Sequence, residues 1–202
     1  MNPTASPPTT SSDTLTWIDL GHGVTINENA WTDQAQRIFS DDLIRMIADL
    51  HRELQPMRRD LLAAREERQA AWDAGDVPGY LPEDEHPDAH GDWQVAPLPD
   101  DLLQRRVEIT GPVSDPKMVI NMLSRNDNGD RADAAMLDFE DSMKPTWPNV
   151  LQGVENVREA AKGTLTYTKP GRDGAPDKEY SLDPDDMPLL MVRIRGLHLA
   201  ES

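Results

Sequence analysis

Cysteine is absent from the 202 residues, so the chain has no disulfide, thiolate metal site or thiol nucleophile. Positive charge is scarce, because 20 lysine and arginine residues face 37 aspartate and glutamate residues and the net charge is −17. This excess repels phosphates, so we expect neither nucleic acid nor an anionic membrane surface as a partner. The sequence contains no apolar run of about 18 residues, so it predicts no transmembrane helix. The composition favours a cytoplasmic protein and specifies no oligomeric state.

Composition and apolar pattern divide the chain into three parts. Residues 1–14 are rich in proline, serine and threonine and lack an apolar run, so they are expected to be a disordered leader rather than a secretory signal. Residues 15–105 contain a long helical pattern and carry most of the negative charge. From residue 106 the pattern becomes strand-like, and we place a domain boundary there, with the second domain spanning 106–202.

An apolar stripe of helical spacing occupies residues 41–74. Pro56 interrupts it, and proline lacks an N–H and clashes with the preceding turn, so the sequence predicts two helices. The first begins after Ser40 as N-cap, and the second runs from Pro56 to Gly75. Residues 76–105 contain five prolines and are predicted to be a long loop. The stripe is expected to pack against the chain itself, with a partner protein as the alternative; it comprises Leu43, Ile47, Leu50, Leu54, Met57, Leu61 and Ala64.

The second domain alternates between strand and helix patterns. A strand–helix–strand–helix order with a final strand implies parallel strands joined by right-handed crossovers, and therefore an α/β fold. A β-hairpin is predicted before the last strand. The predicted strands are residues 107–110, 134–139 and 189–194, the helices are 115–124 and 146–162, and the hairpin strands are 165–168 and 179–182.

Charged residues follow two of these strands. Asp138, Glu140 and Asp141 come at the end of the second strand, and Arg193 and Arg195 at the end of the third. The carboxyl ends of parallel strands meet at one edge of a sheet, which is where chemistry collects. Strand alternation places Asp138 and Glu140 on one face and Asp141 on the other. From the residues alone, a structural ion-pair network and a site gripping an oxygen-rich substrate both stay open.

Four segments, in this order, resemble malate synthases of the A type, and a helical leader with LLAAR at residues 61–65 accompanies them. The segments are RRVEITGPVSDPKMVINML (105–123), MLDFEDSMKPTWPNVLQG (136–153), NVREAAKGTLTY (156–167) and VRIRGLHL (192–199). This family joins acetyl-CoA to glyoxylate, giving malate and CoA in the glyoxylate cycle. The resemblance implies that residues 15–105 are an N-terminal helical clasp domain with a long loop. It also implies that residues 106–202 begin a TIM (β/α)8 barrel, with three strands and a hairpin insertion.

The resemblance also assigns roles to particular residues. Arg193 falls on the catalytic, substrate-binding first arginine of the family's R-x-R-G-x-H-L motif. Ser142, which closes the D-x-E-D-S block, falls on a position that contacts acetyl-CoA in related enzymes. The family uses Mg²⁺ to hold glyoxylate, and Asp138, Glu140 and Asp141 are expected to form a supporting shell near that ion. The ligands of the ion and the aspartate base are expected beyond residue 202.

A complete barrel needs eight βα units and about 250 residues, so we expect this chain to be the N-terminal part of a longer enzyme and inactive alone. Two alternatives stay open. One is a non-catalytic acidic interaction domain, or remnant, that binds a partner protein through the stripe of residues 43–64. The other is an acyl-CoA lyase of the citrate-lyase type, against which the helical leader and the VEITGP block argue.

Overall fold

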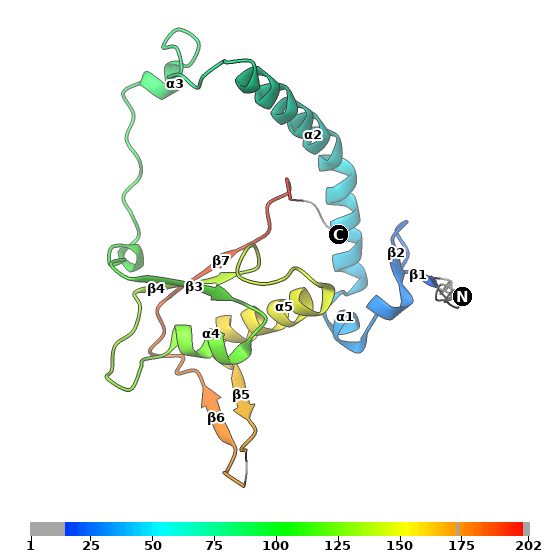
Figure 1. The fold of residues 1–202 in the computed structure, drawn as a ribbon, viewed down its shortest axis with the longest axis vertical. Helices are drawn as coiled ribbons and strands as arrows, with labels where there is room; N and C mark the ends of the chain where they lie inside the picture. Colours follow the sequence, from blue (N-terminus) through cyan, green and yellow to red (C-terminus); the bar gives the residue numbers. More distant parts are fainter. Residues whose placement is uncertain (1–14, 173, 200–202) are drawn as a thin grey trace, which may run out of the picture. The chain divides into compact units, whose positions relative to one another are not determined.

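A computed structural model describes residues 15–172 and 174–199 (Figure 1). The predicted disordered leader, residues 1–14, lies outside the described residues. By its internal contacts the chain divides into two compact units, Met1–Glu53 and Leu54–Ser202, which are described separately below. This division falls inside one continuous helix, and the domain boundary expected near residue 106 stays a prediction.

The first unit begins with a short antiparallel hairpin. Its strands are β1 (Trp17–Asp19) and β2 (Thr25–Asn27), and the turn at residues 21–23 has positive φ angles throughout. A short 3-10 helix (Glu28–Ala30) and helix α1 (Asp33–Ile38) follow. The sequence analysis missed these elements, because three-residue strands and a six-residue helix are too short to show a readable periodicity.

Helix α2 (Asp41–Asp73) is a single helix of 33 residues, so the prediction of two helices is wrong. Pro56 lies inside it and cannot donate a hydrogen bond to the carbonyl of Arg52. The helix continues because most of its surface is exposed, where water can hydrate that carbonyl. No helix in the described part of the chain combines the length and the apolar character that a membrane span requires.

The apolar stripe on α2 is largely exposed, contrary to the expectation that the chain covers it. Ile47, Leu50, Leu54, Met57 and Leu61 are between 45% and 62% exposed. The buried residues of α2 come from another part of its circumference, at positions 44 and 48. Helical spacing therefore specified an apolar face without specifying what packs on it.

Residues 76–105 follow α2 as the predicted long loop. Within it the structure places only two short helical turns, α3 (Pro87–His90) and a 3-10 turn (Asp100–Leu102).

The second unit contains a parallel sheet, as predicted. Its order is β3-β4-β7, formed by β3 (Glu108–Pro112), β4 (Ala134–Asp138) and β7 (Leu189–Arg193). Helix α4 (Pro116–Leu123) connects the first two strands, and α5 (Trp147–Ala161) follows the second. Both helices lie on the same side of the sheet (Figure 1). This arrangement confirms the α/β class.

Two details differ slightly from the sequence prediction. The hairpin forms from β5 (Thr166–Lys169) and β6 (Lys178–Ser181), each within one residue of expectation. Strand β3 continues through Gly111 and Pro112, two residues beyond the end of the predicted strand 107–110. Proline is tolerated here because β3 is an edge strand of the described sheet and Pro112 is its last residue.

The core lies between the sheet and its two helices. Alternation along β4 turns Ala135 and Leu137 toward the helices, where both are fully buried. Met136 and Asp138 therefore face the opposite side. The helices contribute Val119, Ile120, Met122, Leu123 and Ala160 to this core.

Helix α5 packs closely on its neighbours because Gly153 has no side chain. A Cβ at this position would overlap Val113 and lie 2.7 Å from Cε1 of Phe139. We expect Gly153→Ala to lower the free energy of unfolding by about 1–3 kcal/mol in urea titrations, despite alanine's higher helix propensity. The control is Gly79→Ala, whose Cβ would meet nothing within 4 Å. Equal losses in the two variants would contradict this packing argument.

Candidate functional site

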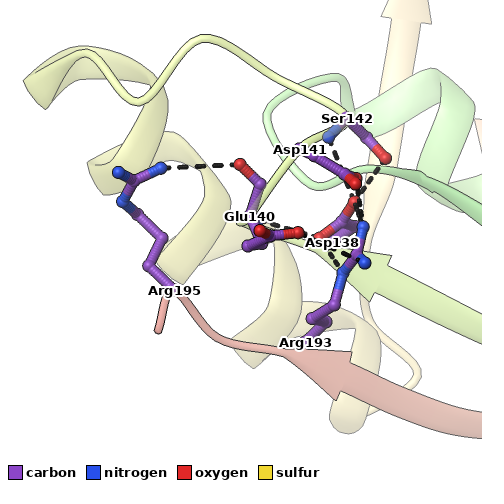
Figure 2. A network of polar contacts seen from close by, with 6 residues as sticks. All are labelled: Asp138, Glu140, Asp141, Ser142, Arg193 and Arg195. Carbon is purple, nitrogen blue, oxygen red and sulfur yellow. Dashed lines mark hydrogen bonds and ion pairs between the residues drawn. The ribbon is translucent and has the colours of Figure 1, made fainter. Parts of the chain in front are cut away.

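The candidate site lies at the carboxyl ends of two neighbouring strands. Asp138 ends β4 and Arg193 ends β7, and the parallel register pairs these two residues directly. Residues paired in register project to the same face of a sheet. Both side chains therefore lie on the face away from α4 and α5, where they meet Glu140, Asp141 and Ser142 (Figure 2).

Asp138 grips the guanidinium of Arg193 with both carboxylate oxygens. Nε of Arg193 donates to Oδ1 over 2.8 Å, and Nη2 donates to Oδ2 over 2.6 Å. This fork-to-fork geometry fixes the plane of the guanidinium as well as its position. Nη1 lies 3.2 Å from Oε2 of Glu140, and Nη2 also donates to Asp141. One guanidinium is thus surrounded by three carboxylates.

The turn after β4 brings these carboxylates together. Asp138 accepts hydrogen bonds from the backbone amides of Glu140, over 2.8 Å, and of Ser142, over 3.1 Å, and from the Ser142 hydroxyl. Such short-range side-chain bonds fold the backbone back on itself. The expectation that Asp141 points to the opposite face is therefore wrong, because the strand ends at Asp138 and its alternation stops there.

The three acidic side chains differ in how far they are buried. Asp138 is fully buried, the Glu140 side chain is 24% exposed and that of Asp141 is 68% exposed, while Arg193 is 35% exposed. Hydrogen bonding to Arg193 holds the pKa of Asp138 well below its usual range, although burial acts in the opposite direction. The same bond raises the pKa of Arg193. The pair is therefore charged at neutral pH, where the four groups together carry a net charge of −2.

Arg195 takes a different direction. Its guanidinium points away from the three carboxylates, and Nη1 lies 3.5 Å from the backbone carbonyl of Glu140 (Figure 2). This long contact supports the turn rather than the acid cluster. The two arginines at the carboxyl end of β7 therefore differ in their surroundings.

The acid cluster has the oxygen donors that a hard divalent cation prefers. One carboxylate oxygen from each of Asp138, Glu140 and Asp141 lies within 4.8 Å of the others. However, both oxygens of Asp138 already accept hydrogen bonds, and the other two acids pair with Arg193. The three acids therefore form a cradle for a guanidinium and do not present a ready ligand set for a metal.

The sequence correctly predicted that these residues meet at the carboxyl edge of the sheet, but it did not predict the hydrogen bonds and ion pairs between them. It did not anticipate that Ser142 donates to Asp138, nor that a single arginine holds all three acids. A local signal existed, since an aspartate side chain often accepts a hydrogen bond from the backbone amide two residues later, as Asp138 does from Glu140.

Comparison with known proteins gives a consistent result over most of the chain. Residues 23–86 match the family described as the N-terminal domain of malate synthase. The malate synthase of Myxococcus xanthus is 42% identical over 182 residues, which cover 90% of this chain and 31% of that protein. Malate synthase A of Escherichia coli is 39% identical, covering 88% of this chain and 32% of its own length.

A plant malate synthase is similar to this chain to a comparable extent. The glyoxysomal malate synthase of Ricinus communis is 36% identical over 188 residues, or 91% of this chain and 30% of the plant protein. The chain thus spans about a third of the length of the curated relatives it matches. By sequence, the chain is similar to malate synthases over most of its length, and its residues 23–86 match the N-terminal domain of that family.

Proposed function

We propose that this chain is the N-terminal part of a malate synthase, an acyltransferase that condenses acetyl-CoA with glyoxylate and water to give malate and CoA. The observation that carries the proposal is Arg193, held by Asp138 at the carboxyl edge of a parallel sheet. The sequence similarity to malate synthases over about 90% of the chain supports it. We assign the activity to the longer protein, since the chain corresponds to about a third of it.

Arg193 is the residue to which we assign charge stabilisation. When the acetyl thioester loses a methyl proton, negative charge develops on the thioester oxygen. A guanidinium already fixed in place stabilises that charge without reorganising. The carboxylate contacts account for four of its five N–H groups. We assign the fifth, on Nη1, to the developing oxyanion.

The proton itself must go to a carboxylate of ordinary basicity. Asp138 does not suit this task, because Arg193 keeps its pKa well below the usual range and both of its oxygens accept hydrogen bonds. Glu140 and Asp141 pair with the same guanidinium. We therefore propose that these three acids form a supporting shell and that the general base comes from polypeptide outside residues 1–202.

The resemblance implies Mg²⁺ in the complete enzyme. The acid cluster does not fit as its ligand set, because every member is engaged with Arg193. We derive no step through the ion and propose that its ligands also come from outside residues 1–202. The net charge of −2 on the cluster is compatible with a cation bound nearby.

We propose that Ser142 contacts acetyl-CoA. The structure limits the kind of hydrogen bond that its hydroxyl can make with this ligand. Its hydroxyl hydrogen is directed to Asp138, so only the oxygen lone pairs are left to meet a ligand. A group of CoA that donates a hydrogen bond, such as an amide N–H, would satisfy this geometry. A phosphate or carbonyl oxygen would not.

Two further assignments complete the proposal. We propose that the β3-β4-β7 sheet is the first part of a TIM barrel, which its parallel order and its helices on one side support. We propose a cytoplasmic location, in keeping with the absence of cysteine. Some relatives are named glyoxysomal.

The chain of residues 1–202 is expected to produce no malate alone. It supplies the charge-stabilising arginine, but the proposal places the base and the metal ligands elsewhere. The measurement is release of free thiol from acetyl-CoA by the purified chain, with and without glyoxylate and Mg²⁺. Steady release that depends on glyoxylate would show that the chain contains its own base.

A chimera tests the proposed function directly. This chain would replace the 182-residue aligned segment of the Myxococcus xanthus malate synthase, and malate formation would be followed. We expect glyoxylate-dependent turnover in the chimera. If the chimera folds and binds acetyl-CoA but forms no malate, the proposed function is wrong for this chain.

A further inference from the structure

Each oxygen of Asp138 is held by donors of the turn after β4 as well as by Arg193 (Figure 2). Oδ1 accepts hydrogen bonds from the backbone amide of Glu140 and from Nε of Arg193, each over 2.8 Å. Oδ2 accepts hydrogen bonds from Nη2 of Arg193 over 2.6 Å, from the backbone amide of Ser142 over 3.1 Å, and from the Ser142 hydroxyl. The hydroxyl therefore binds the same oxygen that holds the Nη2 end of the guanidinium.

The Ser142 hydroxyl helps to fix the direction of this carboxylate. The terminal torsion of an aspartate side chain has no sharply preferred angle, so hydrogen bonds decide the plane of the two oxygens. Without the hydroxyl, the turn would hold Oδ2 only through the 3.1 Å bond from the Ser142 amide. Asp138 is fully buried, so it has no exposed surface at which bulk water could replace a lost donor.

A second arginine–aspartate pair in the chain has the same forked geometry. Arg125 donates from Nε to Oδ2 of Asp186 over 2.6 Å and from Nη2 to Oδ1 over 2.9 Å. Asp186 also accepts a hydrogen bond from Nη1 of Arg131 over 2.7 Å, and its side chain is 36% exposed. Among the described contacts of the two carboxylates, a hydroxyl donor occurs at Asp138 and not at Asp186. The second pair is therefore an internal reference for the effect of the hydroxyl.

We propose that Ser142 is a positioning residue for Arg193 and acts through Asp138. Its hydroxyl fixes Oδ2, and Oδ2 fixes Nη2. Because the guanidinium is planar and rigid, the direction of Nη1 is then fixed as well. Nη1 carries the N–H that we assign to the developing oxyanion, so this inference rests on the proposed function. A donor that is fixed before the charge develops stabilises that charge without reorganisation.

The positioning role and the proposed contact with acetyl-CoA have different kinetic signatures. Loss of a contact that is equally strong in the bound substrate and in the transition state raises KM and leaves kcat unchanged. Loss of an interaction made only in the transition state lowers kcat, even when both substrates saturate the enzyme. The hydroxyl hydrogen serves Asp138 and the lone pairs are left for the ligand, so the two roles are compatible and are read from separate constants.

Ser142→Ala is expected to lower kcat by about 10-fold in the chimera with the Myxococcus xanthus sequence, measured with both substrates saturating. Ser142→Thr keeps a hydroxyl and is expected to restore most of this loss. Ser181→Ala removes an exposed hydroxyl from the end of β6 and is expected to leave kcat unchanged. An unchanged kcat in Ser142→Ala, or an equal loss in Ser142→Ala and Ser142→Thr, would overturn the proposal.

A second measurement uses the chain of residues 1–202 and does not depend on catalysis. NMR of isotope-labelled protein would follow the exchange of arginine Nε–H hydrogens with water, and Arg193→Lys would identify the Arg193 signal. Ser142→Ala is expected to speed exchange at Arg193 by at least about 10-fold, because the bond from Nε to Asp138 opens more often. Exchange at Arg125, whose Nε donates to the carboxylate without a hydroxyl donor, should not change.

The two measurements separate this inference from the proposed function. A chimera that forms no malate would contradict the proposed function, and exchange at Arg193 would then decide whether Ser142 positions the guanidinium. Equal exchange at Arg193 in wild type and Ser142→Ala would overturn the positioning role, even if the chimera is active. Faster exchange at Arg193 and Arg125 alike would mean that the whole fold has loosened, and this result would also count against the proposal.

Discussion

Arg193→Ala is expected to lower kcat for malate formation by about 100-fold or more in the chimera, as loss of a fixed donor to a developing oxyanion does. The reason lies in the geometry of the site. Asp138 holds Nε and Nη2 through two hydrogen bonds, so the guanidinium does not move as charge develops. Alanine removes the cation that contacts all three carboxylates. The measurement is steady-state kinetics with acetyl-CoA and glyoxylate varied separately.

Two controls distinguish this role from loss of structure. Arg193→Lys keeps one positive charge but lacks the planar guanidinium. A lysine therefore cannot bind both oxygens of Asp138 and also direct an N–H at the developing oxyanion. We expect kcat to fall at least about 10-fold. Arg68→Ala removes an arginine from an exposed position on α2 and is expected to leave kcat unchanged. A near-normal kcat in Arg193→Ala, with an unaltered fold by circular dichroism, would remove Arg193 from the catalytic assignment.

The sheet could be predicted because its signals are local and its rules are strong. Strands β4 and β7 are short apolar runs, and helices α4 and α5 are amphipathic. Parallel order then follows from the chirality of βαβ connections. That same order brings Asp138 opposite Arg193, so the meeting of acid and arginine was predictable without any structure.

The arrangement within the site was less predictable. Alternation is a property of extended strands, and it was applied to Asp141 beyond the residue where β4 ends. The actual direction of Asp141 is decided by the turn that Asp138 and Ser142 close. Side-chain hydrogen bonds of this kind depend on where a strand stops, and sequence patterns locate strand ends only to within a few residues.

The first unit shows a second kind of limit. A proline inside a helical pattern normally predicts a break, because it removes one hydrogen bond and adds a steric clash. In α2 the helix passes through Pro56, so the remaining helical bonds on both sides outweigh that local cost. The periodicity of the stripe was correct, but coverage of a helix face depends on distant segments that periodicity does not reveal.

Asp138→Asn is expected to lower the free energy of unfolding of the chain by about 3 kcal/mol at pH 7, as removal of one partner of a buried ion pair commonly does. The carboxylate is fully buried, and it accepts bonds from Arg193, from the Ser142 hydroxyl and from two backbone amides. An asparagine has one oxygen to offer where the aspartate offers two. Its amide N–H groups would also point at the N–H and O–H groups that donate to Asp138, and those donors would be left without an acceptor.

The pH dependence of this loss has a definite sign. Because Arg193 holds the pKa of Asp138 below its usual range in the folded chain, the carboxylate stabilises the fold fully above its unfolded pKa of about 4. That stabilisation is lost as the pH falls toward the folded pKa. The difference between wild type and Asp138→Asn should therefore shrink between pH 5 and pH 3 in urea titrations. Other carboxylates with lowered pKa values, such as Asp186, are common to both proteins and cancel.

Asp84→Asn supplies the matched control, since Asp84 is exposed within the loop of residues 76–105 and its variant should unfold like wild type at every pH. A difference between wild type and Asp138→Asn that stayed constant from pH 7 to pH 3 would mean that the charge of Asp138 does not stabilise the fold. The loss of stability would then come from the lost hydrogen bonds rather than from the charge. In that case Arg193 would still depend on Asp138 for its direction, and the chimera carrying Asp138→Asn would lose turnover together with the same stability at every pH.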